Sequence, residues 1–167
     1  SVGITDGATI TATYTATDGA SPANTRTCTV TITVNAPEIN VKGNDTNIAD
    51  GDASPSPTDH TNFGSTTGAT ITRTFTIENL GHAALSLAAG SITLTGTDAG
   101  LFSVGNITLP ATVNGPSGTI TFDVTYTPVG AGTHVATVNI AANDCNEGTY
   151  NFDIQGFRSC SAASFTA

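Results

Sequence analysis

The chain of 167 residues carries 13 acidic and 4 basic residues, which gives a net charge of −9, and only 10% of its residues are charged. A field of that sign repels phosphate backbones and the basic residues form no cluster, so the composition argues against nucleic-acid binding. The hydrophobic content of 38% supports a core, whereas no apolar run approaches the ~18 residues that a membrane span needs, so we expect no membrane insertion.

Threonine alternates with apolar residues in the first two predicted strands, residues 7–17 and 26–34, which flank a turn at 18–24. A period of two places the apolar side chains on one face of a sheet and the hydroxyls on the other. A sheet of two strands alone is only marginally stable in water, so we expect this hairpin to pack or pair with another part of a protein. The residues that we predict to form its interface are Ile10, Ala12, Tyr14, Cys28, Val30, Ile32 and Val34.

Pro37 separates the hairpin from further rows of the same kind. Turn-forming residues divide these rows, and no stretch has a helical period, so we predict an all-β chain. About seven strands at this spacing fit an immunoglobulin-like antiparallel β-sandwich better than a barrel. The predicted strands are 39–42, 69–78, 84–87, 91–94, 101–104, 119–127, 133–141 and 149–157, with a long irregular loop at 43–63.

Several short motifs follow one another along the chain from Pro37 onwards. They are Pro37-Glu38-Ile39-Asn40-Val41, Ile48-Ala49-Asp50-Gly51-Asp52, Thr61-Asn62-Phe63-Gly64, Arg73-Thr74-Phe75-Thr76-Ile77-Glu78-Asn79, Phe122-Asp123-Val124-Thr125-Tyr126-Thr127-Pro128, Asn143-Asp144 and Tyr150-Asn151-Phe152-Asp153-Ile154-Gln155-Gly156. With them, residues 37–157 resemble the choice-of-anchor D domain of large bacterial surface proteins, which is similar to the immunoglobulin-like domains of the abnormal-spindle and hydin type. Phe157-Arg158 departs from the small residues that usually follow in that family.

The opening hairpin resembles a different family: it is similar to the last two strands of a hyalin-repeat module. Tyr14-Thr15-Ala16-Thr17-Asp18 and Thr27-Cys28-Thr29-Val30-Thr31-Ile32-Thr33-Val34 carry this resemblance. It implies that Cys28 pairs with a cysteine near the start of such a module. We therefore divide the chain into a hairpin of a preceding module or donated strands (1–36), an immunoglobulin-like domain (37–157), and a linker or the start of a following module (158–167).

The cysteines and the composition point to a location outside the cytoplasm. Cys28, Cys145 and Cys160 are too far apart for a zinc site, and abundant Thr, Gly and Asn with little Lys favour an oxidising, extracellular or cell-surface setting. A strand of about nine residues spans ~30 Å, which argues against a Cys145–Cys160 bridge. A Cys28–Cys160 bridge and a bridge between subunits both stay open. Because the chain lacks methionine even at position 1, we expect it to be part of a longer or processed protein.

The loop after the first strand of the sandwich contains the best candidate for a metal site. Asp45, Asp50, Asp52 and Asp59 could supply hard oxygen ligands to calcium, and we expect no other cofactor. The competing interpretation is a loop of Asx turns whose carboxylates bind their own backbone. Asp144, Asn146 and Glu147 form a second acidic group, which we interpret as a solvated hairpin tip.

No catalytic motif is visible, so we expect no enzyme. His60, His82 and His134 stand singly, and no nucleophile elbow is present. The resemblance implies a structural or adhesive repeat of a large exported protein, with roles such as adhesion, gliding or a surface fibre, whose partners are neighbouring repeats or identical subunits. One alternative is a filament subunit assembled by strand donation. A module that binds surface glycans or proteins is the other, and the lack of tryptophan argues against it.

Overall fold

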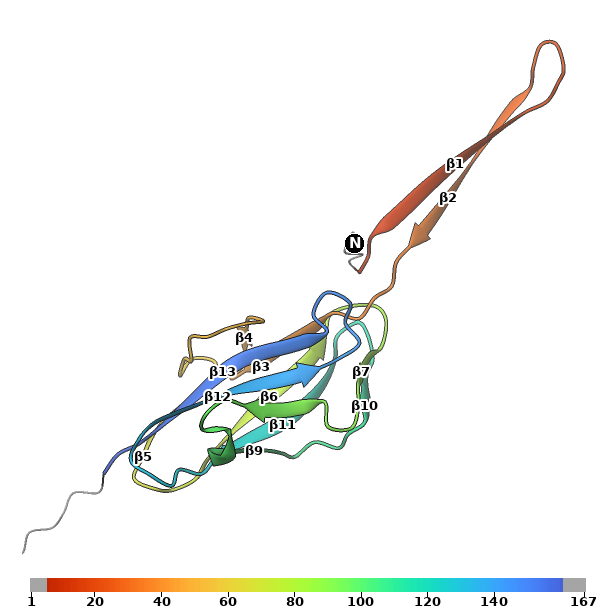
Figure 1. Cartoon of the computed structure of the whole chain (residues 1–167). Helices are drawn as coiled ribbons and strands as arrows, with labels where there is room; N and C mark the ends of the chain where they lie inside the picture. Colours follow the sequence, from red (N-terminus) through yellow and green to blue (C-terminus); the bar gives the residue numbers. More distant parts are fainter. Residues whose placement is uncertain (1–5, 161–167) are drawn as a thin grey trace, which may run out of the picture.

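The computed structural model describes residues 6–160, and nearly all of their regular structure is β. A long hairpin projects from one end of a β-sandwich (Figure 1). Within these residues the single helical element is a 3₁₀ turn, Ala99–Leu101. No helix in this part of the chain is long and apolar enough to cross a membrane. Residues 161–167 of the predicted C-terminal linker lie outside the described residues.

The hairpin consists of β1 (Thr9–Thr17) and β2 (Thr25–Thr33), which form a two-stranded antiparallel sheet of their own. Their register runs from Thr9↔Thr33 to Thr17↔Thr25 without a shift. Asp18 closes the turn, because its Oδ1 accepts hydrogen bonds from the backbone N–H groups of Ala20 (3.2 Å) and Asn24 (2.9 Å). Burial of side chains contributes little here, since almost every residue of the two strands is exposed.

The sandwich consists of two main sheets, and its fold is an immunoglobulin-like antiparallel β-sandwich. The first sheet has the order β4-β3-β6-β11-β9, and the second has the order β5-β13-β12-β8, in which β5 runs parallel to β13. A short pair, β7 and β10, closes one side. The bounds are β3 (Ile39–Gly43), β4 (Thr46–Ile48), β5 (Asn62–Thr66), β6 (Ile71–Asn79), β7 (Leu85–Leu87), β8 (Ile92–Thr95), β9 (Phe102–Gly105), β10 (Ala111–Val113), β11 (Gly118–Tyr126), β12 (Gly132–Ala141) and β13 (Thr149–Arg158).

The core forms because alternate residues of the long strands face inwards. Phe75 on β6 lies at 5.5 Å, ring centroid to centroid, from both Phe122 on β11 and Phe152 on β13, and all three are fully buried. Gly156 makes room for the buried Tyr126 ring, since a Cβ at this position would lie 2.4 Å from Tyr126 Cε1. The core residues all belong to the sandwich, so the hairpin contributes nothing to it.

The chain enters the sandwich at one end and leaves it at the opposite end. Ile39 at the start of β3 donates its backbone N–H to Asp144 Oδ2, and Asp144 lies in the loop that precedes β13. β3 and β13 therefore begin at the same end, beside the hairpin, and β13 ends at the other (Figure 1). We call these the hairpin end and the far end.

The prediction of an all-β, immunoglobulin-like chain is confirmed, with local corrections to the strands. The loop predicted at 43–63 contains β4 and the start of β5, and β10 was not predicted. Residue 101 ends the 3₁₀ turn and does not begin a strand. β4 and β10 have three residues each, too few for a period of two to be recognised in a sequence.

Candidate functional site

The hairpin carries an apolar face that no other described residue covers. Across the two strands Ile10 pairs with Ile32, Ala12 with Val30, and Tyr14 with Cys28, so these side chains share one face. Ile10, Tyr14, Val30 and Ile32 are 58%, 64%, 44% and 56% exposed. The structure thus brings together six of the seven predicted interface residues, while Val34 follows the end of β2 and is half-buried.

Threonine occupies the other face of the hairpin in directly opposed pairs. At the turn, Thr17 Oγ1 lies 3.3 Å from Thr25 Oγ1. These hydroxyls are compatible with water, whereas the opposite face exposes large aliphatic and aromatic side chains. The hairpin is therefore amphipathic, and a partner would be accommodated best on its apolar face or along its edges.

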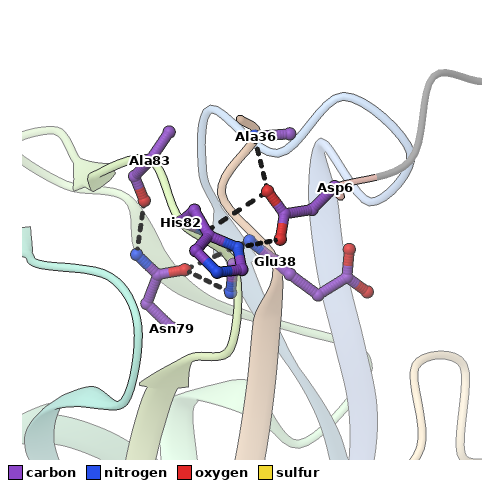
Figure 2. A network of polar contacts seen from close by, with 7 residues as sticks. Asp6, Ala36, Glu38, Asn79, His82 and Ala83 are labelled. Atoms are coloured by element: carbon purple, nitrogen blue, oxygen red, sulfur yellow. Dashed lines mark hydrogen bonds and ion pairs between the residues drawn. The ribbon is translucent and has the colours of Figure 1, made fainter. Parts of the chain in front are cut away.

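Asp6 and His82 join the hairpin to the sandwich, as Figure 2 shows. Asp6 Oδ2 lies 2.6 Å from His82 Nδ1, and Asp6 Oδ1 accepts hydrogen bonds from the backbone N–H groups of Ala36 (2.8 Å) and His82 (3.3 Å). Asp6 precedes β1, Ala36 follows β2, and His82 lies between β6 and β7. One carboxylate thus connects both ends of the hairpin to the sandwich, and its bonds to His82 and Ala36 lower the pKa of Asp6.

Asn79 organises the sandwich side of this junction (Figure 2). Its side chain is fully buried, and its Nδ2 donates to the carbonyls of Ala83 (2.7 Å) and Val113 (2.9 Å). Its Oδ1 accepts the backbone N–H groups of Glu38 (3.2 Å) and Gly81 (3.0 Å). Through these bonds Asn79 fixes both the loop that presents His82 and the entry into β3.

Three carboxylates lie next to the junction. Ligand oxygens of Glu38, Asp144 and Glu147 are all within 4.8 Å of one another. Burial, followed by the neighbouring acidic groups, raises the pKa of Glu38 and of Glu147. Glu147 Oε2 is buried without a hydrogen-bond partner. The interpretation of this segment as a solvated hairpin tip is wrong for Asp144, which is only 4% exposed and accepts the backbone N–H of Ile39 at 2.9 Å.

The four aspartates predicted as calcium ligands do not form a common ligand set. The acidic group described above, the only one in the part of the chain that the structure describes, includes none of Asp45, Asp50, Asp52 and Asp59. Asp52 Oδ1 accepts the N–H of Ser54, and the buried Asp59 accepts both the N–H and the hydroxyl of Thr61. Asp52 and Asp59 thus form Asx turns, as in the competing interpretation, because each of these two carboxylates binds the backbone two residues on. Asp50 Oδ1 instead accepts the N–H of Asn151 on β13 at 2.8 Å.

The Cys28–Cys160 bridge, one of the two pairings that the sequence left open, is not formed in the structure. Cys28, Cys145 and Cys160 are all free and exposed. Cys28 lies on the projecting hairpin, and Cys160 follows β13 at the far end of the sandwich (Figure 1). The ten residues of β13 alone span about 33 Å, far beyond the reach of a disulfide.

Sequence reasoning missed the residues of the junction. In the sequence His82 stands singly, and nothing links it to Asp6, because the two are 76 positions apart. Asn79 belongs to a motif that the sequence singled out, but nothing local indicates that four hydrogen bonds converge on it. The sequence signal that was available is the position of His82 in a short loop directly after that motif.

No protein-family model matches the chain, and no curated protein matches it. Among solved structures, a protein of unknown function from Porphyromonas gingivalis is similar, with 12% identity and a TM-score of 0.53 over 90% of this chain and 66% of that one. The ASH/PapD-like domain 7 of human CEP192 has 16% identity and a TM-score of 0.44 over 76% and 89% of the two chains. The VesB protease of Vibrio cholerae has 17% identity and a TM-score of 0.39 over 57% and 28%. At 12% identity the likeness to the Porphyromonas gingivalis protein concerns the fold alone.

Proposed function

We propose that the chain is a non-catalytic structural or adhesive module of a large bacterial protein of the cell surface or extracellular space. The observation that carries this proposal is the combination of a closed sandwich with a projecting hairpin whose apolar face is uncovered. The motifs shared with choice-of-anchor D domains and with hyalin-type strands agree with it. In this role the sandwich is a spacer, and the hairpin connects it to a neighbouring module or subunit.

The arrangement of the junction supports a connecting role. Asp6 and Ala36 lie at the two ends of the hairpin, and both contact the sandwich. Asp6 contacts His82, and the Ala36 carbonyl accepts the N–H of Ala83 at 3.1 Å. Asn79 holds the same loop through the Ala83 carbonyl. The aromatic side chains Phe75, Phe122, Tyr126 and Phe152 are fully buried. These four rings are therefore not available to stack on sugars.

Two measurements test the proposal. A variant that lacks residues 1–35 should stay folded and unfold cooperatively in urea, because no described core residue comes from the hairpin and only the bonds of Asp6 to the sandwich are lost. An antibody against the chain should label intact, unpermeabilised cells that produce it. If the truncated variant is unfolded, or if labelling requires permeabilisation, the proposal fails.

A second candidate is a subunit of an extracellular filament that assembles by strand donation. The observation that favours it is that, among the strands of residues 6–160, β1 and β2 pair only with each other, which leaves an unpaired edge on each of them. Filaments in electron micrographs of the purified chain, absent after deletion of residues 1–35, would support this function. Filaments that persist after the deletion would contradict it.

A further inference from the structure

We propose that the free edges of β1 and β2 pair with the hairpin of a second copy of this chain, so that hairpins extend one another into a continuous antiparallel sheet. This inference rests on the second of the proposed functions and names its partner. It is carried by three observations on the described hairpin: its unprotected edges, the direction of its backbone groups and its charge.

The edges of the hairpin lack the features that prevent strands from associating. Each strand has nine residues, with no proline, no bulge and Arg26 as the only charged side chain. The edge strands of the sandwich are different. β4, β8 and β9 have three or four residues each, and the pairing of β13 with the five-residue β5 contains a register shift. Short or irregular strands are the usual protection of an edge, so the sandwich is protected and the hairpin is not.

The threonines direct the unpaired backbone groups outwards. Val34 donates its N–H to the carbonyl of Ala8 across the hairpin at 2.8 Å. Hydrogen-bonded and non-bonded pairs alternate along an antiparallel ladder, so the apolar pairs, such as Ala12↔Val30, are the bonded ones. The N–H and C=O groups of Thr13 and Thr29 consequently point away from the hairpin. A strand that adds to either edge meets these groups in register with its own.

The charge distribution favours contact between two copies of the chain at the hairpin and disfavours it over the rest of the surface. Two copies of a chain with a net charge of −9 repel each other over most of their surface. Between Thr9 and Thr33 the only charged residues are Asp18 and Arg26, whose charges cancel. The hairpin is therefore the part of the molecule where two copies can approach without this repulsion, and edge pairing also joins their apolar faces into one.

Concentration-dependent association of the whole chain tests the inference. In sedimentation experiments with reductant, from about 1 μM to about 1 mM, the chain should form dimers and larger species. The double variant Thr13→Pro with Thr29→Pro removes two outward N–H groups without touching the bonded pairs, and should weaken association by at least about tenfold. The matched double variant Thr13→Ala with Thr29→Ala keeps both N–H groups and should associate like the unmodified chain.

Amide hydrogen exchange of the unmodified chain gives a second readout that does not depend on the variants. Protection of the Thr13 and Thr29 amides should rise with concentration, whereas protection of the bonded Val30 amide should not depend on association to the same degree. A chain that stays monomeric at all concentrations, with unprotected Thr13 and Thr29 amides, overturns the inference. In that case the hairpin is completed by other strands, and the structural module stands as long as the truncated sandwich remains folded.

Discussion

Asp6 Oδ2 lies 2.6 Å from His82 Nδ1, and this contact connects residues that are 76 positions apart in the chain. The His82 side chain is 57% exposed and the Asp6 side chain is 13% exposed, so the imidazole is much more accessible to water than the carboxylate. Because Asp6 also accepts the backbone N–H of Ala36, we expect the pair to control how the hairpin is oriented on the sandwich.

Replacing the histidine should free the hairpin. In a Cys145→Ser background, spin labels on the exposed Cys28 and Cys160 report the distance between hairpin and far end. We expect His82→Ala to broaden the distribution of this distance at neutral pH, since Asp6 then retains only its backbone partners. The control His60→Ala alters a histidine in the loop before β5 and should leave the distribution unchanged. Equal distributions for both variants would show that the contact between Asp6 and His82 does not orient the hairpin.

Strong acid should have the same effect on the unmodified junction. Hydrogen bonds from His82 and Ala36 lower the pKa of Asp6 below its ordinary value of 3.8. A carboxyl whose pKa is lower in the folded protein stabilises the fold above the ordinary pKa, and this contribution is lost as pH falls through the lowered value. The Cys28–Cys160 distance distribution should therefore stay narrow at pH 4.5 and broaden well below pH 3.8. Broadening that is already complete at pH 4.5 would contradict this assignment.

Asn79→Ala should destabilise the sandwich strongly. The substitution removes the partners of two carbonyls and two backbone N–H groups at a fully buried position. We expect a loss of about 2–4 kcal/mol in the free energy of unfolding, measured in urea. Asn47→Ala, at an exposed position on β4, should cost no more than about 0.5 kcal/mol. Comparable losses for the two variants would mean that water replaces the bonds of Asn79.

Glu147→Gln should stabilise the protein at neutral pH. The pKa of Glu147 is raised by burial and by nearby acidic groups, so its charge disfavours the fold above the ordinary pKa of 4.5, and this cost disappears below that value. In chelator-treated buffer we expect Tm to rise by about 2 °C at pH 7 and to be unchanged near pH 3.

The matched control for this substitution is Glu78→Gln, for which we expect the opposite sign. The Glu78 carboxylate binds Lys42 Nζ at 2.9 Å and Asn40 Nδ2 at 2.8 Å, and these bonds lower its pKa. Removal of its charge should lower Tm at pH 7. A lower Tm for Glu147→Gln at pH 7 would indicate that its carboxylate is stabilised by a partner.

The parts of this molecule that could be predicted from sequence are those with local causes. Alternation of threonine and apolar residues determines which side chains of the hairpin share a face, because the period of a strand is a property of adjacent residues. The junction has no local cause: Asp6, Asn79 and His82 meet only once the sandwich has formed. The four loop aspartates show the same limit, since closeness in sequence does not indicate whether carboxylates converge, bind their own backbone or, like Asp50, bind another strand.

The position of β3 and β13 determines how the sandwich would carry a mechanical load. The chain enters β3 at the hairpin end and leaves β13 at the far end. A force that pulls the start of β3 away from the end of β13 therefore acts along the strands. The hydrogen bonds between β3 and β6 and between β12 and β13 would then resist shear together and would not open one after another. A domain loaded in this way yields slowly under tension, because forced unfolding is limited by the rate at which the whole ladder breaks.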